Sequence, residues 1–269
     1  PRVERDAYLA AVRKAREYIR AGDVFQVNYA HEFRARFRGE PLALYLRLRE
    51  ANPAPYGAYL DLGGGRAILS TSPELFLRLR GRDVQTRPIK GTRPRGRGER
   101  EDAALREELA RSEKDAAELA MIVDLERNDL GRICVPGSVV VAEERAVETY
   151  ASVHHQVATV RGEVEEGYDR GDLIAAAFPG GSVTGAPKVR AMEIIDELEA
   201  GHRGPYTGAI GLFGDDGSLD LNIAIRTVVV ANGEARLHVG GGIVADSDPE
   251  AEFEETLAKG RAIFHAWGP

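Results

Sequence analysis

Residues 25–37 read Phe-Gln-Val-Asn-Tyr-Ala-His-Glu-Phe-Arg-Ala-Arg-Phe, and apolar side chains largely alternate there with polar ones. A period of two places successive side chains on opposite faces of an extended chain, whereas a helix would repeat near 3.6. The stretch therefore predicts a long strand. Its polar face would carry Gln26, Asn28, Glu32, Arg34 and Arg36. One polar face is typical of a strand in an antiparallel sheet.

Further alternating runs flank this strand and are separated by turn residues. Glycines 63–65 turn a predicted hairpin at residues 56–70, and residues 81–83 turn another at 75–88. Further strands are expected at residues 138–144, 150–161, 206–213, 219–230 and 235–239. Apolar residues at helical spacing predict helices at residues 5–20, 42–50, 101–130, 172–178, 188–199 and 249–266.

Strands joined largely by hairpins favour antiparallel sheets, with the helices covering them. We therefore expect an α+β fold of two packed antiparallel β-sheets flanked by helices. No Ser-, Gly- or Pro-rich linker divides the chain, which predicts a single catalytic domain over residues 1–269. Asp248 and Pro249 are expected to start the last helix, as N-cap and first helical residue.

Composition excludes several classes of function. The formal net charge is −7, which argues against a general nucleic-acid binder because such a protein needs a basic face. The short basic run at residues 93–100 reads instead as a solvated or substrate-facing loop. Cys134 is the single cysteine and cannot form an internal disulfide, which suits a reducing compartment. No signal peptide and no apolar run near 18 residues is present, so we expect a soluble, cytoplasmic protein without a membrane partner.

The motif Pro-Ile-Lys-Gly-Thr-Arg at residues 88–93 places Lys90 just past the end of a predicted strand. Only five of the 36 basic residues are lysine, and unlike arginine a lysine can lose its proton and become a nucleophile. Glu74 follows Ser72-Pro73 at the start of the hairpin that leads to Lys90, so the two form a plausible acid and nucleophile pair. The alternative is that Lys90 provides a solvated charge on a loop.

Two predicted helices each offer two carboxylates one turn apart. Asp115 and Glu118 are three residues apart, as are Glu252 and Glu255, and Lys259 follows four residues later. Four carboxylates that converged would repel one another unless a hard cation such as Mg²⁺ lay between them. The alternative is two ordinary solvated helix faces.

Other motifs have a binding and a structural interpretation. The glycine-rich run at residues 180–188 lacks the lysine position of a P-loop, but its free N–H groups suit a substrate carboxylate. The glycines of residues 211–217 have dinucleotide-binding spacing but belong to a hairpin turn. One of His154 and His155 should point inward, as a core residue or a ligand. Arg226 follows apolar strand residues, and its planar fork suits a carboxylate.

The motifs Ser72-Pro73-Glu74 and Pro-Ile-Lys-Gly-Thr at residues 88–92 resemble the catalytic core of chorismate-utilising enzymes. The lysine version is similar to component I of aminodeoxychorismate synthase, whereas anthranilate synthase typically carries alanine there. The resemblance implies amination of chorismate at C4 to 4-amino-4-deoxychorismate, a step of p-aminobenzoate and folate biosynthesis. In it Glu74 protonates the departing hydroxyl, Lys90 adds at C2, and ammonia then attacks C4 and expels Lys90.

The same resemblance implies the other site residues. Glu118 and Glu255 would be the inner ligands of Mg²⁺, with Asp115 and Glu252 as outer, water-mediated ligands, and the ion would hold the ring carboxylate. His155 would face the ring near C4. Ser182 and Gly185 would meet a substrate carboxylate in the glycine-rich run. The enolpyruvyl carboxylate would be held by Tyr206, Arg226, Gly240, Gly241, Gly242 and Lys259.

Ammonia must reach the site from elsewhere, because the chain has no glutaminase-like Gly-x-Cys-x-Gly segment. We expect a glutamine amidotransferase subunit or dissolved ammonia as the source. Three alternatives remain: anthranilate synthase component I, isochorismate or salicylate synthase, and a chorismate-binding homologue without activity. In the isochorismate branch a lysine that activates water occupies the position of Gln26, so water should not be the nucleophile here.

Overall fold

The computed structural model describes residues 1–267 and divides into two compact units. Unit 1 comprises Pro1–Pro73, Val183–Gly208 and the C-terminal segment from Ala224, and unit 2 comprises Glu74–Ser182 and Ala209–Ile223. The chain leaves unit 1 twice and returns twice, so neither unit is one continuous segment. This explains why the sequence shows no linker between them. A single catalytic domain stays a prediction.

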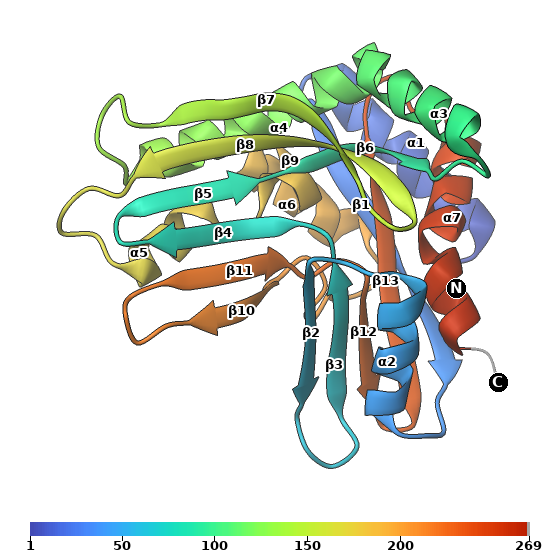
Figure 1. Cartoon of the computed structure of the whole chain (residues 1–269). Coiled ribbons are helices and arrows are strands. Elements are labelled where there is room, and N and C mark those ends of the chain that lie inside the picture. The colour runs from blue at the N-terminus through green and yellow to red at the C-terminus, as the bar shows by residue number, and fades with distance from the viewer. Residues whose placement is uncertain (268–269) are drawn as a thin grey trace. The chain divides into compact units, whose positions relative to one another are not determined.

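Unit 1 contains a six-stranded sheet in the order β2-β3-β12-β13-β1-β9 (Figure 1). Its strands are β1 (Gln26–Arg36), β2 (Tyr56–Asp61), β3 (Ala67–Ser72), β9 (Gly185–Ala186), β12 (Thr227–Ala231) and β13 (Glu234–Ile243). All neighbouring strands are antiparallel, and β1 pairs with β13 from Val27 to Arg36, with Tyr29 opposite Gly241. The strand with which the sequence analysis began is therefore an inner strand of the sheet.

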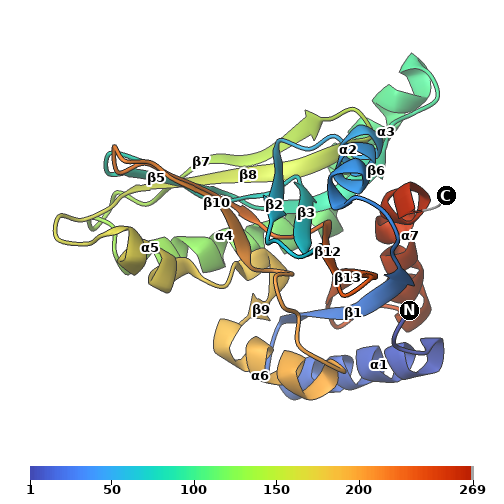
Figure 2. The ribbon, with the colours of Figure 1, turned by 90° about the horizontal axis from the view of Figure 1, so that it is seen from below.

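Helices cover one face of this sheet: α1 (Arg5–Ala21), α2 (Pro41–Ala51), α6 (Lys188–Leu198) and α7 (Pro249–Trp267). Odd-numbered residues of β1 supply the covered face, since Val27 and Tyr29 pack with α1 and α6 while Phe33 packs with α2 and α7. Figure 2 shows α1 and α6 alongside β1. The Asp248 side chain accepts a hydrogen bond from the Ala251 N–H at 3.0 Å, which confirms the predicted N-cap of α7.

The alternation in β1 is confirmed, but its polar face is exposed to solvent only at Arg34 and Arg36, near the end of the strand. Gln26 is 0 % exposed, Asn28 is 5 % exposed and Glu32 is 7 % exposed, whereas Phe25 just before the strand is 73 % exposed. Polar partners make this burial possible, because the Asn28 side chain donates to the Val183 carbonyl at 2.9 Å and Glu32 accepts from Arg34 at 2.7 Å. The alternation in the sequence therefore predicted correctly which side chains share a face of β1. It did not predict whether that face is buried or exposed to solvent.

Unit 2 contains a seven-stranded antiparallel sheet in the order β10-β11-β4-β5-β8-β6, with β7 also paired to β8. Its strands are β4 (Leu75–Arg80), β5 (Asp83–Arg87), β6 (Ile89–Pro94), β7 (Val140–Thr149), β8 (Val153–Glu163), β10 (Ala209–Phe213) and β11 (Leu219–Ile223). Its helices are α3 (Glu99–Arg111), α4 (Glu113–Gly131) and α5 (Arg170–Ala177). Helix α4 runs along β7 and β8 (Figure 1). The expected α+β class, two antiparallel sheets flanked by helices, is confirmed.

Three sequence predictions of elements are wrong. The helix expected at residues 101–130 is two helices, because Ser112 leaves the helical conformation at ψ 107°. The strand expected at residues 219–230 is also two, β11 in the sheet of unit 2 and β12 in that of unit 1. Arg226 lies between them with a φ of 49° and is not a strand residue. Lys90 lies inside β6 rather than past a strand end.

No helix within residues 1–267 is long and apolar enough to span a membrane.

Candidate active site

Lys90 is positioned by a bulge in β6. The strand pairs with β8 so that Lys90 is opposite Gln156 and Thr92 is opposite His155, with an irregularity between them at Gly91. Gly91 has a φ of 78°, and a Cβ there would lie 2.8 Å from both Asp115 Cγ and Leu109 Cδ1. Only glycine fits both constraints. The glycine of the Pro-Ile-Lys-Gly-Thr motif therefore lets the strand that carries Lys90 approach α4.

The amine of Lys90 donates a hydrogen bond to the Ser182 carbonyl at 3.2 Å. The structure thus brings together two predicted site residues that are 92 positions apart in the chain. The Ser182 hydroxyl is buried and has no hydrogen-bond partner within the described part of the chain. A buried hydroxyl group without a hydrogen-bond partner favours binding of a polar ligand beside it.

Glu74 is buried at the start of β4, where its carbonyl accepts a hydrogen bond from the Ile223 N–H at 3.1 Å. It belongs to unit 2 together with Lys90, His155 and Ser182. The role of general acid for Glu74 stays a prediction.

His154 and His155 are both buried, at 0 % and 2 % exposed, so the expectation that only one of them points inward is wrong. Both faces of β8 are covered at this point, and strand alternation sends the two rings in opposite directions. His155 Nδ1 lies 2.8 Å from the Thr92 hydroxyl, and its ring lies 5.7 Å from that of Tyr150. Thr92 links His155 to the same strand that carries Lys90.

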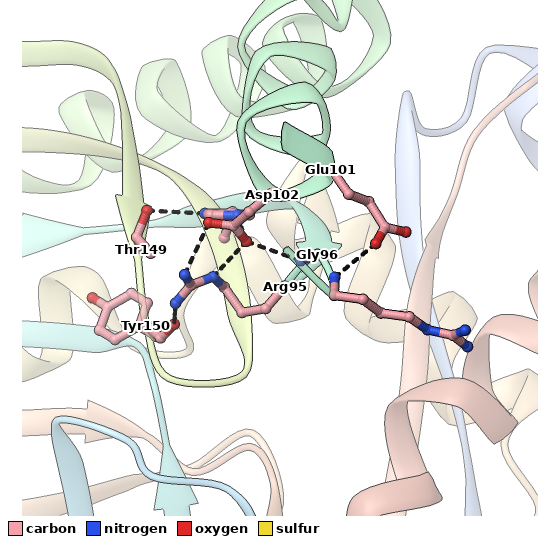
Figure 3. Close-up of polar contacts among 8 residues, drawn as sticks. Arg95, Gly96, Glu101, Asp102, Thr149 and Tyr150 are labelled. Atoms are coloured by element: carbon pink, nitrogen blue, oxygen red, sulfur yellow. Dashed lines mark hydrogen bonds and ion pairs between the residues drawn. The ribbon is translucent and has the colours of Figure 1, made fainter. Parts of the chain in front are cut away.

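Figure 3 shows a polar cluster with Asp102 of α3 at its centre. Asp102 accepts two hydrogen bonds from Arg95, at 2.6 and 2.9 Å, and one from the Gly96 N–H at 2.9 Å. His154 Nε2 is 3.0 Å from Asp102, and its Nδ1 is 2.9 Å from the Thr149 hydroxyl. The Arg95 and Gly96 hydrogen bonds hold the pKa of Asp102 well below its usual range. Through Asp102, the cluster links Arg95, which directly follows β6, to His154 of β8.

The carboxylates of α4 have basic neighbours. Asp115 lies 3.3 Å from Arg93 Nη2, and Glu118 lies 3.9 Å from Lys114 Nζ. The Asp115 N–H donates to the Ser112 hydroxyl at 3.2 Å, because Asp115 occupies the first turn of the helix. Asp115 therefore contacts both Arg93 and the bulge at Gly91.

The carboxylates of α7 gather over β13. Glu252 is buried and accepts from the Ser247 hydroxyl at 2.6 Å, while Glu255 lies 2.6 Å from Lys259 Nζ. A Cβ at Gly241 would lie 3.0 Å from Glu252 and 3.9 Å from Lys259 Nζ. Lys259 also donates to the Gly240 carbonyl at 3.0 Å. The glycines expected to provide backbone contacts thus leave room for charged side chains of α7.

The sequence predicted that both carboxylate pairs bind Mg²⁺. The pair on α4 belongs to unit 2 and the pair on α7 to unit 1, and each is described within its own unit. Within residues 1–267, no group of three or more His, Cys, Asp and Glu side chains is arranged to hold a metal ion. Carboxylate oxygens are the donors that Mg²⁺ prefers, so the chemistry of each pair fits the ion. Magnesium binding stays a prediction.

Arg226 is fixed by the neighbouring strand β3. Its carbonyl accepts from the Thr71 N–H at 3.1 Å, and its Nη1 donates to Asn52 Oδ1 at 3.3 Å. The residue has a left-handed backbone, which is uncommon outside glycine and often marks a functional position. Arg226 therefore lies in the connection between β11 and β12, and not in the continuous strand that the sequence predicted.

Part of the glycine-rich run is strand rather than loop. Gly185 lies opposite Val27 in the β9–β1 pair, and a Cβ on Gly185 would lie 2.1 Å from the Gln26 carbonyl. On the other side of β1, a Cβ on Gly242 would lie 2.9 Å from Gln26 Cδ. Two predicted substrate-binding glycines therefore flank Gln26. Its amide nitrogen and oxygen are buried without a hydrogen-bond partner in the described part of the chain, which indicates a place for a polar ligand.

Tyr206 is almost fully buried, and its ring stacks on that of His238 with centroids 5.4 Å apart and an interplanar angle of 16°. Burial raises the pKa of the Tyr206 hydroxyl to about 12, so it acts as a hydrogen-bond donor at neutral pH. The sequence analysis missed Arg203, which lies 5.6 Å from the same ring. An arginine in a polar loop gives no sequence signal of burial.

A comparison with known protein families matches residues 1–265 to the model of the chorismate binding enzymes. The chain belongs to this family. The chain is 52% identical over 262 residues to anthranilate synthase component 1 of Thermus thermophilus, covering 97% of this chain and 56% of that protein. It is 49% identical over 261 residues to aminodeoxychorismate synthase component 1 of Bacillus subtilis, covering 97% of this chain and 55% of that protein.

Among solved structures, the chain resembles anthranilate synthase component I of Streptococcus pneumoniae with a TM-score of 0.90 and 38% identity. That likeness covers 98% of this chain and 58% of the solved chain. The chain thus spans a little more than half the length of these relatives. The family expected from the two sequence motifs is confirmed.

Proposed function

We propose that this chain aminates chorismate at C4 with ammonia to give 4-amino-4-deoxychorismate, through a covalent bond to Lys90. The observation that carries the proposal is the lysine itself. It lies within β6 beside a glycine bulge, with its amine 3.2 Å from the Ser182 carbonyl. A carbonyl acceptor holds the lysine side chain in a defined direction, which a nucleophile requires.

The proposed reaction balances in two steps. Glu74 donates a proton to the C4 hydroxyl, and the neutral Lys90 amine forms a bond to C2. The C1=C2 and C5=C6 double bonds shift to C1=C6 and C4=C5, and water leaves from C4. Ammonia then forms a bond to C4, the double bonds shift back, and the C2–N bond to Lys90 breaks so that Lys90 leaves as the neutral amine. The ammonium group formed at C4 returns one proton to Glu74. The net change replaces one hydroxyl with one amino group and releases water.

The remaining predicted residues would bind and orient the substrate. Arg226 and Tyr206 offer N–H and O–H donors to the enolpyruvyl carboxylate, and Lys259 offers a positive charge. Glu118 and Glu255, with Asp115 and Glu252, would hold a Mg²⁺ ion whose charge would offset that of the ring carboxylate. His155 would face the ring near C4.

Anthranilate synthase chemistry is the second candidate, because relatives with that name match this chain as closely as aminodeoxychorismate synthases do. There ammonia would bond to C2 directly, with no lysine adduct. Gln26 argues against a third possibility, in which water is the nucleophile, because an amide has no useful basicity. Isochorismate as the main product without added ammonia would contradict this reading.

The test of the proposal is a covalent adduct on Lys90. Incubation with chorismate and Mg²⁺ but no ammonia should increase the intact mass by chorismate less water, with the increase mapped to the peptide containing Lys90. Lys90→Ala should lose the adduct and shift residual product towards anthranilate, which fluoresces directly. Lys14→Ala, on the outer surface of α1, is the matched control and should behave as the parent. Unchanged aminodeoxychorismate formation by Lys90→Ala without any adduct would overturn the proposal.

The name "component 1" of the relatives supports a partner that supplies ammonia. We propose a glutamine amidotransferase subunit in this role. The isolated chain should then use ammonium salts but not glutamine, and adding the subunit should make glutamine a substrate.

A further inference from the structure

Arg203 lies between α6 and β10 and has all five of its guanidinium N–H donors occupied. It donates to both oxygens of Glu199, at 2.9 and 2.6 Å. The Val183 carbonyl accepts at 2.9 Å, the Asn28 carbonyl at 2.6 Å and the Thr207 hydroxyl at 3.3 Å. A planar fork of five donors is the full hydrogen-bonding capacity of an arginine. Arg203 therefore has no donor left for a substrate.

These partners belong to three segments of unit 1. Asn28 is in β1, Val183 precedes Gly185 in the glycine-rich run, and Thr207 adjoins Tyr206. Glu199 also accepts from the Ala30 N–H of β1 at 2.9 Å, so the ion pair is itself anchored to the sheet. Each segment except β1 carries a residue for which the sequence predicted substrate binding.

Tyr206 depends on this arrangement for its position. The Arg203 guanidinium lies 5.6 Å from the Tyr206 ring, which also stacks on His238. Thr207 has a left-handed backbone with a φ of 64°, a conformation that a β-branched residue adopts only when its surroundings impose it. Its hydroxyl, which accepts from Arg203, donates to the Tyr206 carbonyl at 2.6 Å. Arg203 thus maintains the turn that directs Tyr206.

The side chains of Arg203 and Glu199 are only 13% and 5% exposed. A buried ion pair gains little net stability over an apolar pair of the same volume, because both charges lose their hydration. It provides a fixed geometry instead, since two charged groups with directed hydrogen bonds permit few alternative arrangements.

We propose that Arg203 is the positioning residue that clamps the Tyr206 turn and the Val183–Gly185 segment onto β1, and thereby sets the affinity of this site for chorismate. The part concerning chorismate rests on the proposed function. The clamp itself does not. A lysine keeps the charge but presents a single ammonium in place of the fork, so Arg203→Lys should release part of the clamp.

The experiment compares Arg203→Lys and Glu199→Gln with the parent and with Arg190→Lys. Arg190 is a suitable control because it also pairs with carboxylates, Asp23 and Glu193, but on the surface of α6. Amide hydrogen exchange reports the clamp without any ligand. Both clamp variants should show at least tenfold faster exchange in residues 183–186 and 204–207, and unchanged exchange in β4 and β5.

Equilibrium binding and kinetics report the consequence for the substrate. Arg203→Lys should raise the Kd and KM for chorismate about tenfold or more while kcat at saturation changes less than threefold. Glu199→Gln, which removes the charge and keeps the shape, should behave in the same way even if Arg203→Lys fails to fold. Unchanged exchange in the two segments would overturn the clamp. Faster exchange with an unchanged Kd would overturn its link to binding. A parent that binds no chorismate would instead refute the proposed function and leave the exchange result standing.

Discussion

His31 is a neutral histidine inside the helix-covered face of β1, surrounded by aromatic rings. The rings of Phe33 and Tyr8 lie 4.5 and 4.8 Å away, and its Nε2 lies 2.9 Å from the Thr256 hydroxyl. Burial lowers the pKa of His31 from 6.5 to about 4. The unfolded chain therefore takes up a proton at this residue as pH falls from 6.5 towards 4, while the folded chain does not. Stability should decline across that window by at most about 1.4 kcal/mol per pH unit.

His31→Gln should remove this contribution, because glutamine does not titrate. We expect the free energy of unfolding of the variant, measured in urea between pH 4.5 and 7, to depend on pH less steeply than that of the parent. Parallel pH profiles of His31→Gln and the parent would contradict the prediction.

At the residue scale, the sequence indicated chemical types more reliably than contacts. Lys90 was identified because an amine is rare among the basic residues, and the structure places it beside Ser182. The same reasoning could not find Arg203, because one arginine among many has no distinguishing chemistry until its five partners are known. Gln26 likewise becomes notable only once burial shows that its amide has no hydrogen-bond partner in residues 1–267.

The break between α3 and α4 depends on one side chain at the scale of the element. Ser112 ends α3 and caps α4, accepting a hydrogen bond from the Asp115 N–H at 3.2 Å. Loss of such a cap typically costs about 1 kcal/mol. Ser112→Ala should therefore lower the free energy of unfolding by about 1 kcal/mol, whereas Ser112→Thr, which keeps a hydroxyl, should lower it by clearly less. Urea unfolding followed by circular dichroism measures both, and equal losses would argue against the cap.

The sequence contained a signal for this break but none for the one between β11 and β12. Serine followed by acidic residues is typical of a helix start, although the continuous apolar spacing at residues 101–130 concealed it. Ala224, Ile225 and Arg226 include no glycine or proline, so nothing local marks a strand end there. The break arises because the flanking strands pair in different sheets, a long-range property that local propensity does not encode.

At the scale of the whole molecule, hairpin spacing was enough to predict antiparallel sheets, because short connections leave few other pairings. The assignment of strands to two units was not predictable in this way. Each unit is assembled from separate stretches of chain, and the sheet of unit 1 draws on all three of its segments. Local patterns identify the elements, while only packing decides which of them share a core.

Magnesium dependence is a prediction about the whole chain and rests on two carboxylates, Glu118 of α4 and Glu255 of α7. If both bind the ion as the family resemblance implies, each substitution to glutamine should abolish amination. The fold should survive, because both side chains lie outside the buried core and glutamine keeps their volume. Product formation during a Mg²⁺ titration, with far-ultraviolet circular dichroism for folding, measures the two effects separately.

Two matched controls distinguish loss of a ligand from a general loss of negative charge. Asp124→Asn on α4 and Glu254→Gln on α7 each remove one exposed carboxylate from the same helices and should keep parental activity and Mg²⁺ dependence. Chelation by EDTA should stop turnover of the parent and of both controls, and added Mg²⁺ should restore it. Full activity in EDTA, or Glu118→Gln and Glu255→Gln variants as active as the controls, would show that these carboxylates do not act through a metal ion.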